Sequence, residues 1–177
     1  MEAYISQAIS IVAMALQVIA YQFKKNSTYL TLFGIGGSLF AVSFFLLGED
    51  GYASAIINVV GVFKNFTFAH HSRKMFRRFY MYLFVFLYAA STVAISIITM
   101  EFDIISYLIL MAQIVGTVSI WTDSARIIRK AQLYFIIPIW LLNCTVNFNI
   151  GGILCQLFVA VSILISVKRY GWDGLDK

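Results

Sequence analysis

The sequence predicts an all-α protein that crosses a membrane seven times, with the N-terminus outside and the C-terminus inside. Three observations lead to this fold class. The 177 residues are 61% hydrophobic and 12% charged, whereas a soluble domain is roughly 25% charged. Seven apolar stretches of about 20 residues each are long enough to cross about 30 Å of hydrocarbon. The segments that join these stretches alternate in net charge along the chain.

The first three spans are expected at residues 3–23, 29–47 and 53–69. The first ends at a pair of lysines, and the second ends at a Gly-Glu-Asp-Gly turn. The third ends at a segment that is rich in His, Arg and Lys. Because an acid and no base precedes the first apolar run, we interpret that run as a retained helix and not as a cleaved signal peptide.

Four further spans are expected at residues 79–99, 104–121, 131–147 and 151–168. Acidic residues follow the fourth span, mainly basic residues follow the fifth, and Lys168 and Arg169 close the seventh. Pro138 lies inside the sixth span. A proline there removes a backbone hydrogen bond, so we expect it to kink this helix.

The net charges of the joining segments set the predicted orientation, because an excess of Lys and Arg marks the cytoplasmic side. The same pattern places the net charge of +5 on a membrane face, so we expect no nucleic-acid partner. In chain order the segment charges are +2 (24–28), −2 (48–52), +4 (70–78), −2 (100–103), +2 (122–130), 0 (143–151) and +1 (168–177).

The order of spans and loops repeats on either side of a central span. Residues 1–78 are expected to form a first triple-helix bundle, 79–103 a linker helix, and 104–177 a second triple-helix bundle with a short cytoplasmic tail. Because one helix separates the halves, they have the same orientation. An axis along the membrane normal would then relate them, as in transporters built from parallel repeats.

Uncharged polar residues inside the spans supply the candidate site. Ser54, Asn58 and Asn65 share one helical face. Ser6, Ser10, Ala13 and Gln17 form a similar stripe in the first span, and two further spans carry stripes of small or amide residues. One interpretation is a central cavity lined by hydrogen-bonding groups. The other is contact between helices, since small residues allow close approach and amides bond across the interface. The candidate substrate-binding residues are Asn58, Gln156, Phe40, Trp140, Asn143, Asn147, Ser54 and Gln17.

All eight carboxylates lie in loops or tails. Since proton-coupled carriers usually need titratable groups inside the membrane, this favours passive facilitation or an uncoupled binding role. The sequence has no evident catalytic constellation, so we expect no enzyme activity, no metal and no cofactor. Lys64 is interpreted as a lysine that extends to the cytoplasmic interface, in preference to an anion ligand. Cys144 and Cys155 are interpreted as small core residues, in preference to a disulfide.

Four short segments resemble the SWEET and PQ-loop (MtN3-like) family of membrane proteins. They are the apolar run at 39–48, Pro-Ile-Trp-Leu-Leu-Asn at 138–143, the Asn-x-x-Gly motif at 58–61 and Ala-Tyr-Gln-Phe at 20–23. Within that clan the whole chain looks most like the YgjV-type bacterial inner-membrane proteins.

This resemblance implies a small-solute transporter of the bacterial inner membrane. The solute, expected to be small and polar or neutral, would bind between the halves near Asn58 and Gln156, beneath Phe40 and Trp140. The same clan contains a sorting receptor. The alternative is therefore a non-transporting receptor or assembly partner that uses the basic segment 70–78. The expected partners are the solute, the lipid bilayer and further copies of the chain in a homo-oligomer.

Overall fold

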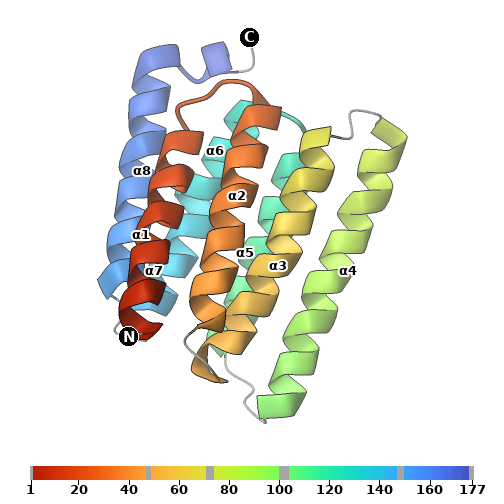
Figure 1. The fold of residues 1–177 in the computed structure, drawn as a ribbon. Helices are drawn as coiled ribbons and strands as arrows, with labels where there is room; N and C mark the ends of the chain where they lie inside the picture. Colours follow the sequence, from red (N-terminus) through yellow and green to blue (C-terminus); the bar gives the residue numbers. More distant parts are fainter. Residues whose placement is uncertain (1, 47–48, 71–73, 100–103, 147–149, 176–177) are drawn as a thin grey trace.

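The computed structural model describes residues 2–46, 49–70, 74–99, 104–146 and 150–175, and every regular element in these ranges is a helix (Figure 1). The prediction of an all-α fold is therefore confirmed. The elements are α1 (Glu2–Ala20), α2 (Asn26–Phe45), α3 (Glu49–His70), α4 (Lys74–Thr99), α5 (Ile104–Trp121), α6 (Ala125–Ala131), the π-helical turn η1 (Gln132–Ile136), α7 (Ile137–Val146), α8 (Ile150–Tyr170) and the 3₁₀ turn η2 (Asp173–Leu175).

Several of these helices are suited to cross a membrane. Since α6, η1 and α7 follow one another without a break, they form one rod. In the part of the chain that the structure describes, the segments long and apolar enough to span a bilayer are Asn26–Phe45, Phe76–Ile98, Ala125–Val146 and Gly152–Tyr170. The apolar parts of α1 and α5 are shorter. Four spans are thus supported, and the crossings by α1, α3 and α5 stay predictions.

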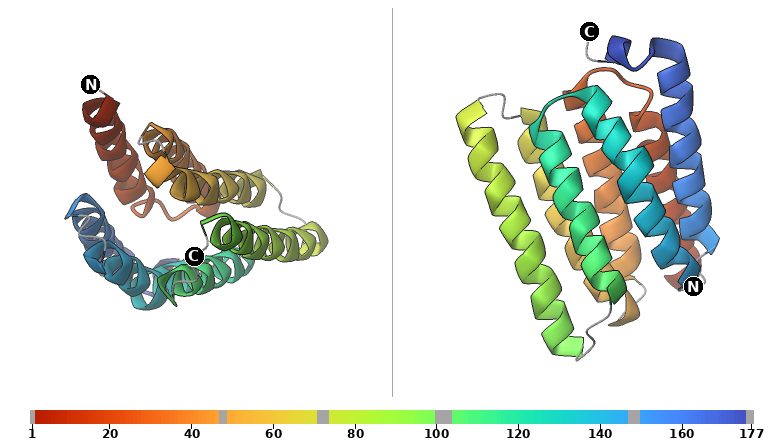
Figure 2. Two further views of the ribbon diagram at one scale, coloured as in Figure 1. Left: turned by 90° about the horizontal axis from the view of Figure 1, so that it is seen from below. Right: turned by 180° about the vertical axis from the view of Figure 1, so that it is seen from behind.

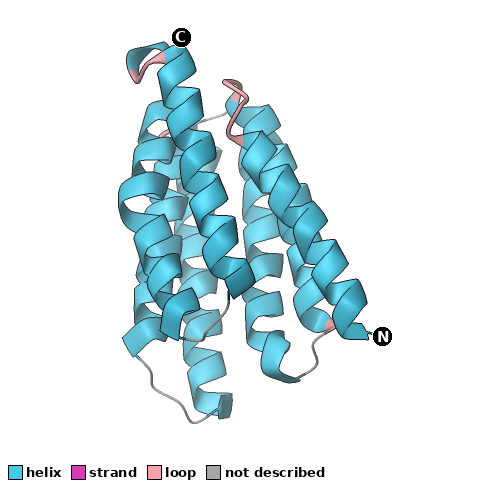
Figure 3. Ribbon diagram, turned by 90° about the vertical axis from the view of Figure 1, so that its left-hand side faces the viewer, coloured by secondary structure: helices cyan, strands magenta, loops and turns pink. Residues whose placement is uncertain are grey.

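The two ends of the bundle differ in charge. The N-terminus lies at one end and the C-terminus at the other, and successive long helices run in opposite directions (Figures 1 and 3). The acidic first turn of α3 lies at the same end as the N-terminus. The opposite end, which we call the basic end, holds the loop after α1, the start of α4, α6 and the last turn of α8. These segments contain Lys24, Lys25, Arg77, Arg126, Arg129, Lys168 and Arg169.

The sixth predicted span begins at Ala125 rather than at residue 131. Ser124 caps this helix, because its Oγ accepts a hydrogen bond from the Ile127 N–H at 3.2 Å. Asp123, just before it, has φ 59°, a left-handed conformation that Asp tolerates in turns. The basic residues that we assigned to a loop therefore lie in the first turns of a helix. Smaller shifts occur elsewhere: α1 ends at residue 20 rather than 23, and α4 begins at 74 rather than 79.

The backbone widens into a π-helical turn just before Pro138. The Ile137 N–H bonds to the carbonyl of Gln132, five residues earlier, instead of four. Pro138 has no N–H, so the carbonyl four residues before it loses its helical partner. A π-helical adjustment is a known response to such a loss in membrane helices. A π-helical turn thus precedes the proline, and the expected kink of the sixth span stays a prediction.

Glycines let α2 pack closely between α1 and α3 (Figure 2). A Cβ on Gly36 would lie 3.0 Å from the carbonyl oxygen of Ala13 on α1. On the other side of α2, a Cβ on Gly34 would lie 3.2 Å from the ring of Phe66 on α3. Small residues are the usual means of close contact between membrane helices. The glycines of α2 therefore set the spacing of the first three helices.

The second half has the same order of neighbours. The rod of α6, η1 and α7 packs against α5 on one side and α8 on the other, while α4 contacts α3 and α5 (Figure 2). The first and last helices, α1 and α8, also touch. Much of the buried apolar core lies toward the basic end, where Tyr21, Tyr29, Leu30, Phe68, Ile120, Ile128 and Ile163 pack together.

Candidate functional site

Asn58 and Gln156, the two amides expected beside the solute, are both half-buried. Asn58 lies on α3 and Gln156 on α8. The Oε1 atom of Gln156 is buried and has no hydrogen-bond partner. Leaving such an atom unpaired costs roughly 1–3 kcal/mol, so it is suited to accept a hydrogen bond from a bound molecule. α3 packs mainly against α2 and α4, whereas α8 packs against α7 and α1. In the predicted division of the chain, the two amides fall in different halves.

The small polar stripe of α1 faces α2. The Oγ atoms of Ser6 and Ser10 lie 2.9 and 2.6 Å from the Oγ of Ser43, in the part of α2 that runs beside them. The Cγ of Gln17 lies 3.0 Å from the place that a Cβ on Gly36 would take. These contacts favour packing between helices as the role of this stripe, Gln17 included.

The two predicted aromatic residues lie on corresponding helices of the two halves. Phe40 is half-buried on α2 and its ring stacks on Phe44, with centroids 6.3 Å apart. Trp140 and Asn143 are half-buried on α7. The side chain of Ser54 and the whole of Asn147 lie outside the described residues.

Lys64 does not extend to the membrane interface, so that expectation is wrong. The residue is 6% exposed, and its Nζ lies 5.1 Å from the centroid of the Tyr88 ring on α4. The attraction between an ammonium and the face of an aromatic ring accounts for part of this placement.

Five residues join the two halves at the basic end, and we call them the basic junction: Gln22, Asn26, Asp123, Arg129 and Ser162. The most buried is Arg129, which is 1% exposed. Its guanidinium donates to the carbonyl oxygens of Tyr21 and Phe23 at 3.0 and 2.7 Å. Since both carbonyls belong to the loop after α1, Arg129 ties α6 to the first half.

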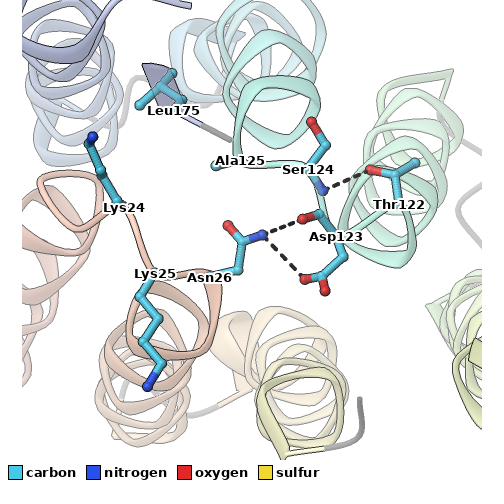
Figure 4. Close-up of a pocket in the computed structure, with 8 residues that line it drawn as sticks. All are labelled: Lys24, Lys25, Asn26, Thr122, Asp123, Ser124, Ala125 and Leu175. Carbon is cyan, nitrogen blue, oxygen red and sulfur yellow. Dashed lines mark hydrogen bonds between the residues drawn. The ribbon is translucent and has the colours of Figure 1, made fainter. Parts of the chain in front are cut away.

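Asn26 and Asp123 make the second contact of the basic junction (Figure 4). The Nδ2 of Asn26 donates to the main-chain oxygen of Asp123 at 2.5 Å and to its carboxylate at 3.2 Å. Arg77, at the start of α4, pairs with the same carboxylate at 3.3 Å and donates to the Ile120 carbonyl at 2.8 Å. The loop after α5 is thus held by α2 and α4 together.

Gln22 and Ser162 make the third contact. The Nε2 of Gln22 donates to the Oγ and the carbonyl oxygen of Ser162 at 2.7 and 2.9 Å. The Ser162 hydroxyl in turn donates to the Val18 carbonyl at 2.6 Å. This chain of hydrogen bonds joins the end of α1 to α8.

A depression of about 580 Å³ opens beside the basic junction (Figure 4). Its walls come from the loops that follow α1 and α5, which are corresponding loops of the two halves, and from the C-terminal segment. Most of its lining is polar or charged. It is lined by Lys24, Lys25, Asn26, Thr122, Asp123, Ser124, Ala125 and Leu175.

Sequence reasoning counted Arg129 and Asp123 only as loop charges. The Ser124 cap and the turn at Asp123 were available signals, and they would have placed Arg129 inside a helix. The burial of Arg129 depends on the loop after α1, which lies about a hundred residues away in the sequence. No local pattern encodes that approach.

A family of bacterial inner membrane proteins, Imp-YgjV, matches residues 4–172. No curated protein and no solved structure matches the chain. The family match covers nearly the whole chain, and several described helices are long and apolar enough to cross a bilayer. The chain therefore belongs to the Imp-YgjV family and is a multi-pass protein of the bacterial inner membrane.

Proposed function

We propose that the protein is a transporter for a small polar or neutral solute, working as an uncoupled facilitator with a site near the membrane midplane between its halves. The main support for this proposal is the arrangement of residues where the two halves meet. The basic junction joins them at one end of the bundle, whereas Gln156, about 9 Å from Ser162 along α8, has an unpaired amide oxygen. A closed gate beside an uncharged polar site is the arrangement that alternating access requires.

The order of helix neighbours supports two like-oriented halves. In each half the second of three rods lies between the other two, and α4 packs between α3 and α5. Rocking of such halves against each other moves access from one side of the membrane to the other. The excess of Lys and Arg places the basic end in the cytoplasm, so the basic junction would be the cytoplasmic gate.

The absence of acidic residues from the apolar stretches of the sequence supports an uncoupled mechanism. The carboxylates lie in loops, tails or the first turns of helices. A proton relay usually uses an Asp, Glu or His within the membrane. Passive movement of a solute down its gradient needs only hydrogen-bonding groups such as those of Asn58 and Gln156.

The competing proposal, a receptor that binds a partner through the basic segment 70–78, has less support. Arg77 belongs to that segment, yet it is 5% exposed and bonded to Ile120 and Asp123. Its guanidinium is therefore engaged in contacts within the protein and is not accessible to a partner.

Uptake into proteoliposomes tests the transport proposal. A solute is first chosen from a panel by its ability to raise the unfolding temperature of the purified protein. We expect Asn58→Ala and Gln156→Ala each to lower its uptake about tenfold, the effect of losing one hydrogen bond of about 1.4 kcal/mol. Leu157→Ala is the control, because Leu157 is 48% exposed beside Gln156. Wild-type uptake by both amide variants would refute the midplane site.

A further inference from the structure

Lys64 is a buried cation that the proposed transport mechanism does not use. In the part of the chain that the structure describes, the ion pairs are Arg77–Asp123 and Arg126–Asp173, and neither includes Lys64. The nearest acid on its own helix is Asp50, which lies about 21 Å away along α3. A buried ammonium without a counter-charge is costly, so this position calls for an anion.

Tyr88 presents an unpaired hydroxyl to the same place. It is 1% exposed, and its Oη is buried without a hydrogen-bond partner. The Oη lies 3.2 Å from where a Cβ on Gly61 would stand, so the hydroxyl reaches α3 about one turn from Lys64. Because Gly61 has no side chain, the hydroxyl can approach the helix there.

Asn65 adds a third group. It is 4% exposed, and its Oδ1 is buried without a partner. Gly61, Lys64 and Asn65 lie within an arc of about 100° on α3, centred on the side that meets Tyr88. Native proteins pair roughly 90% or more of their buried polar groups. Two unpaired oxygens beside a buried lysine, on one pair of helices, therefore point to a ligand.

We propose that Lys64, Tyr88 and Asn65 form a binding site for a small carboxylate. The Lys64 ammonium supplies the opposite charge, the Tyr88 hydroxyl donates a hydrogen bond to the carboxylate, and the Asn65 oxygen accepts one from a hydroxyl on the same molecule. The contact of Lys64 with the Tyr88 ring leaves the Tyr88 Oη and the Asn65 Oδ1 without hydrogen bonds. A bound hydroxycarboxylate would form a hydrogen bond with each of them. One lysine matches one negative charge.

Binding of glycolate and of its neutral analogue glycolamide tests this site. The wild-type protein, held in nanodiscs of phosphatidylcholine alone so that no anionic headgroup competes, is titrated with each compound by calorimetry. We expect glycolate to bind and glycolamide not to bind. Lys64→Met should abolish glycolate binding. Tyr88→Phe, which keeps the ring and loses only the hydroxyl, should weaken it about tenfold.

Lys25→Met is the matched control, because it removes an exposed lysine at the basic end. The proposal is overturned if Tyr88→Phe binds glycolate as tightly as wild type, since Lys64 would then only stack on the ring. Equal losses for Lys25→Met and Lys64→Met, or no binding by wild type, also overturn it. If Lys64→Met does not fold, Tyr88→Phe and the glycolamide comparison still decide. The assay measures no uptake, so its outcome is separate from that of the transport proposal.

Discussion

Arg129 holds the two halves together through main-chain oxygens and not through a carboxylate. A guanidinium carries several donors in a fixed fork, so one side chain reaches the carbonyls of both Tyr21 and Phe23. When such a bond breaks at the end of a bundle, the carbonyls and the guanidinium can be solvated by water and no acid is left buried. If the protein transports a solute as proposed, Arg129 is therefore suited to a gate that opens and closes.

Arg129→Lys is expected to destabilise the protein by about 2 kcal/mol, because one ammonium cannot replace the fork and a charged hydrogen bond contributes about 1.5–3 kcal/mol. Unfolding in denaturant is followed with a thiol-reactive dye, since Cys144 and Cys155 are free and buried. Arg126→Lys is the control. Arg126 is 42% exposed in its ion pair with Asp173, so its loss should cost less than about 1 kcal/mol. Equal effects would contradict the role given to Arg129.

The helices show which parts of the fold local sequence determines. The apolar stretches and their charged ends placed every long helix to within a few residues, because span length and loop charge are local properties. The start of α6 was misplaced since basic residues suggested a loop, while the weaker capping signal of Ser124 was the correct one. The α1 stripe was read correctly as one face. Its partner, α2, became evident only from the packing.

At the element scale, the contact of α1 with α2 should fail when α2 gains a methyl group. Gly36→Ala places a Cβ 3.0 Å from the Ala13 carbonyl oxygen, and such overpacking costs about 1–3 kcal/mol. Gly174→Ala is the control, because the nearest atom to its Cβ is 4.0 Å away. The same dye-based unfolding assay measures both variants. Equal stability of the two variants would mean that the contact between α1 and α2 accommodates the extra methyl group without cost.

A second prediction at this scale concerns the loops of the basic junction. In a Cys144→Ala/Cys155→Ala background, cysteines are introduced at Asn26 and Asp123. A short cross-linker with two thiol-reactive methanethiosulfonate groups then joins them through disulfide bonds that a reductant can break. We expect the link to stop solute uptake and a reductant to restore it, because the halves could no longer separate at the basic end. The single Asn26→Cys variant, treated in the same way, should keep its uptake. Full uptake by the linked protein would show that this junction does not open during transport.

For the molecule as a whole, the sequence predicted properties that depend on the summed charges of its loops. It missed properties that depend on contacts between residues far apart in the chain. The separation of basic from acidic ends follows from loop charges alone. The cluster of Lys64, Tyr88 and Asn65 requires α4 to lie against α3, and the local sequence of α3 contains no sign of that neighbour. The resemblance implied Asn58 and Gln156 as neighbours of the solute, and the structure adds the unpaired oxygen of Gln156.

The orientation of the whole molecule has its own test. Fluorescent protein fused to the C-terminus should fold and fluoresce, because the basic end is expected in the cytoplasm. A cysteine added before Met1 should react with an impermeant thiol reagent applied to spheroplasts. Both termini on one side would mean an even number of crossings and would exclude the seven-span arrangement.

The central claim is that water reaches an uncharged site between the halves, and thiol accessibility at Gln156 tests it most directly without a known solute. In the Cys144→Ala/Cys155→Ala background, Gln156→Cys should react with an impermeant thiosulfonate added outside spheroplasts, since the basic junction is closed on the other side. Leu154→Cys, at a position 47% exposed on the same helix, should stay unreactive in lipid. Failure of Gln156→Cys to react from either side of the membrane would contradict the claim.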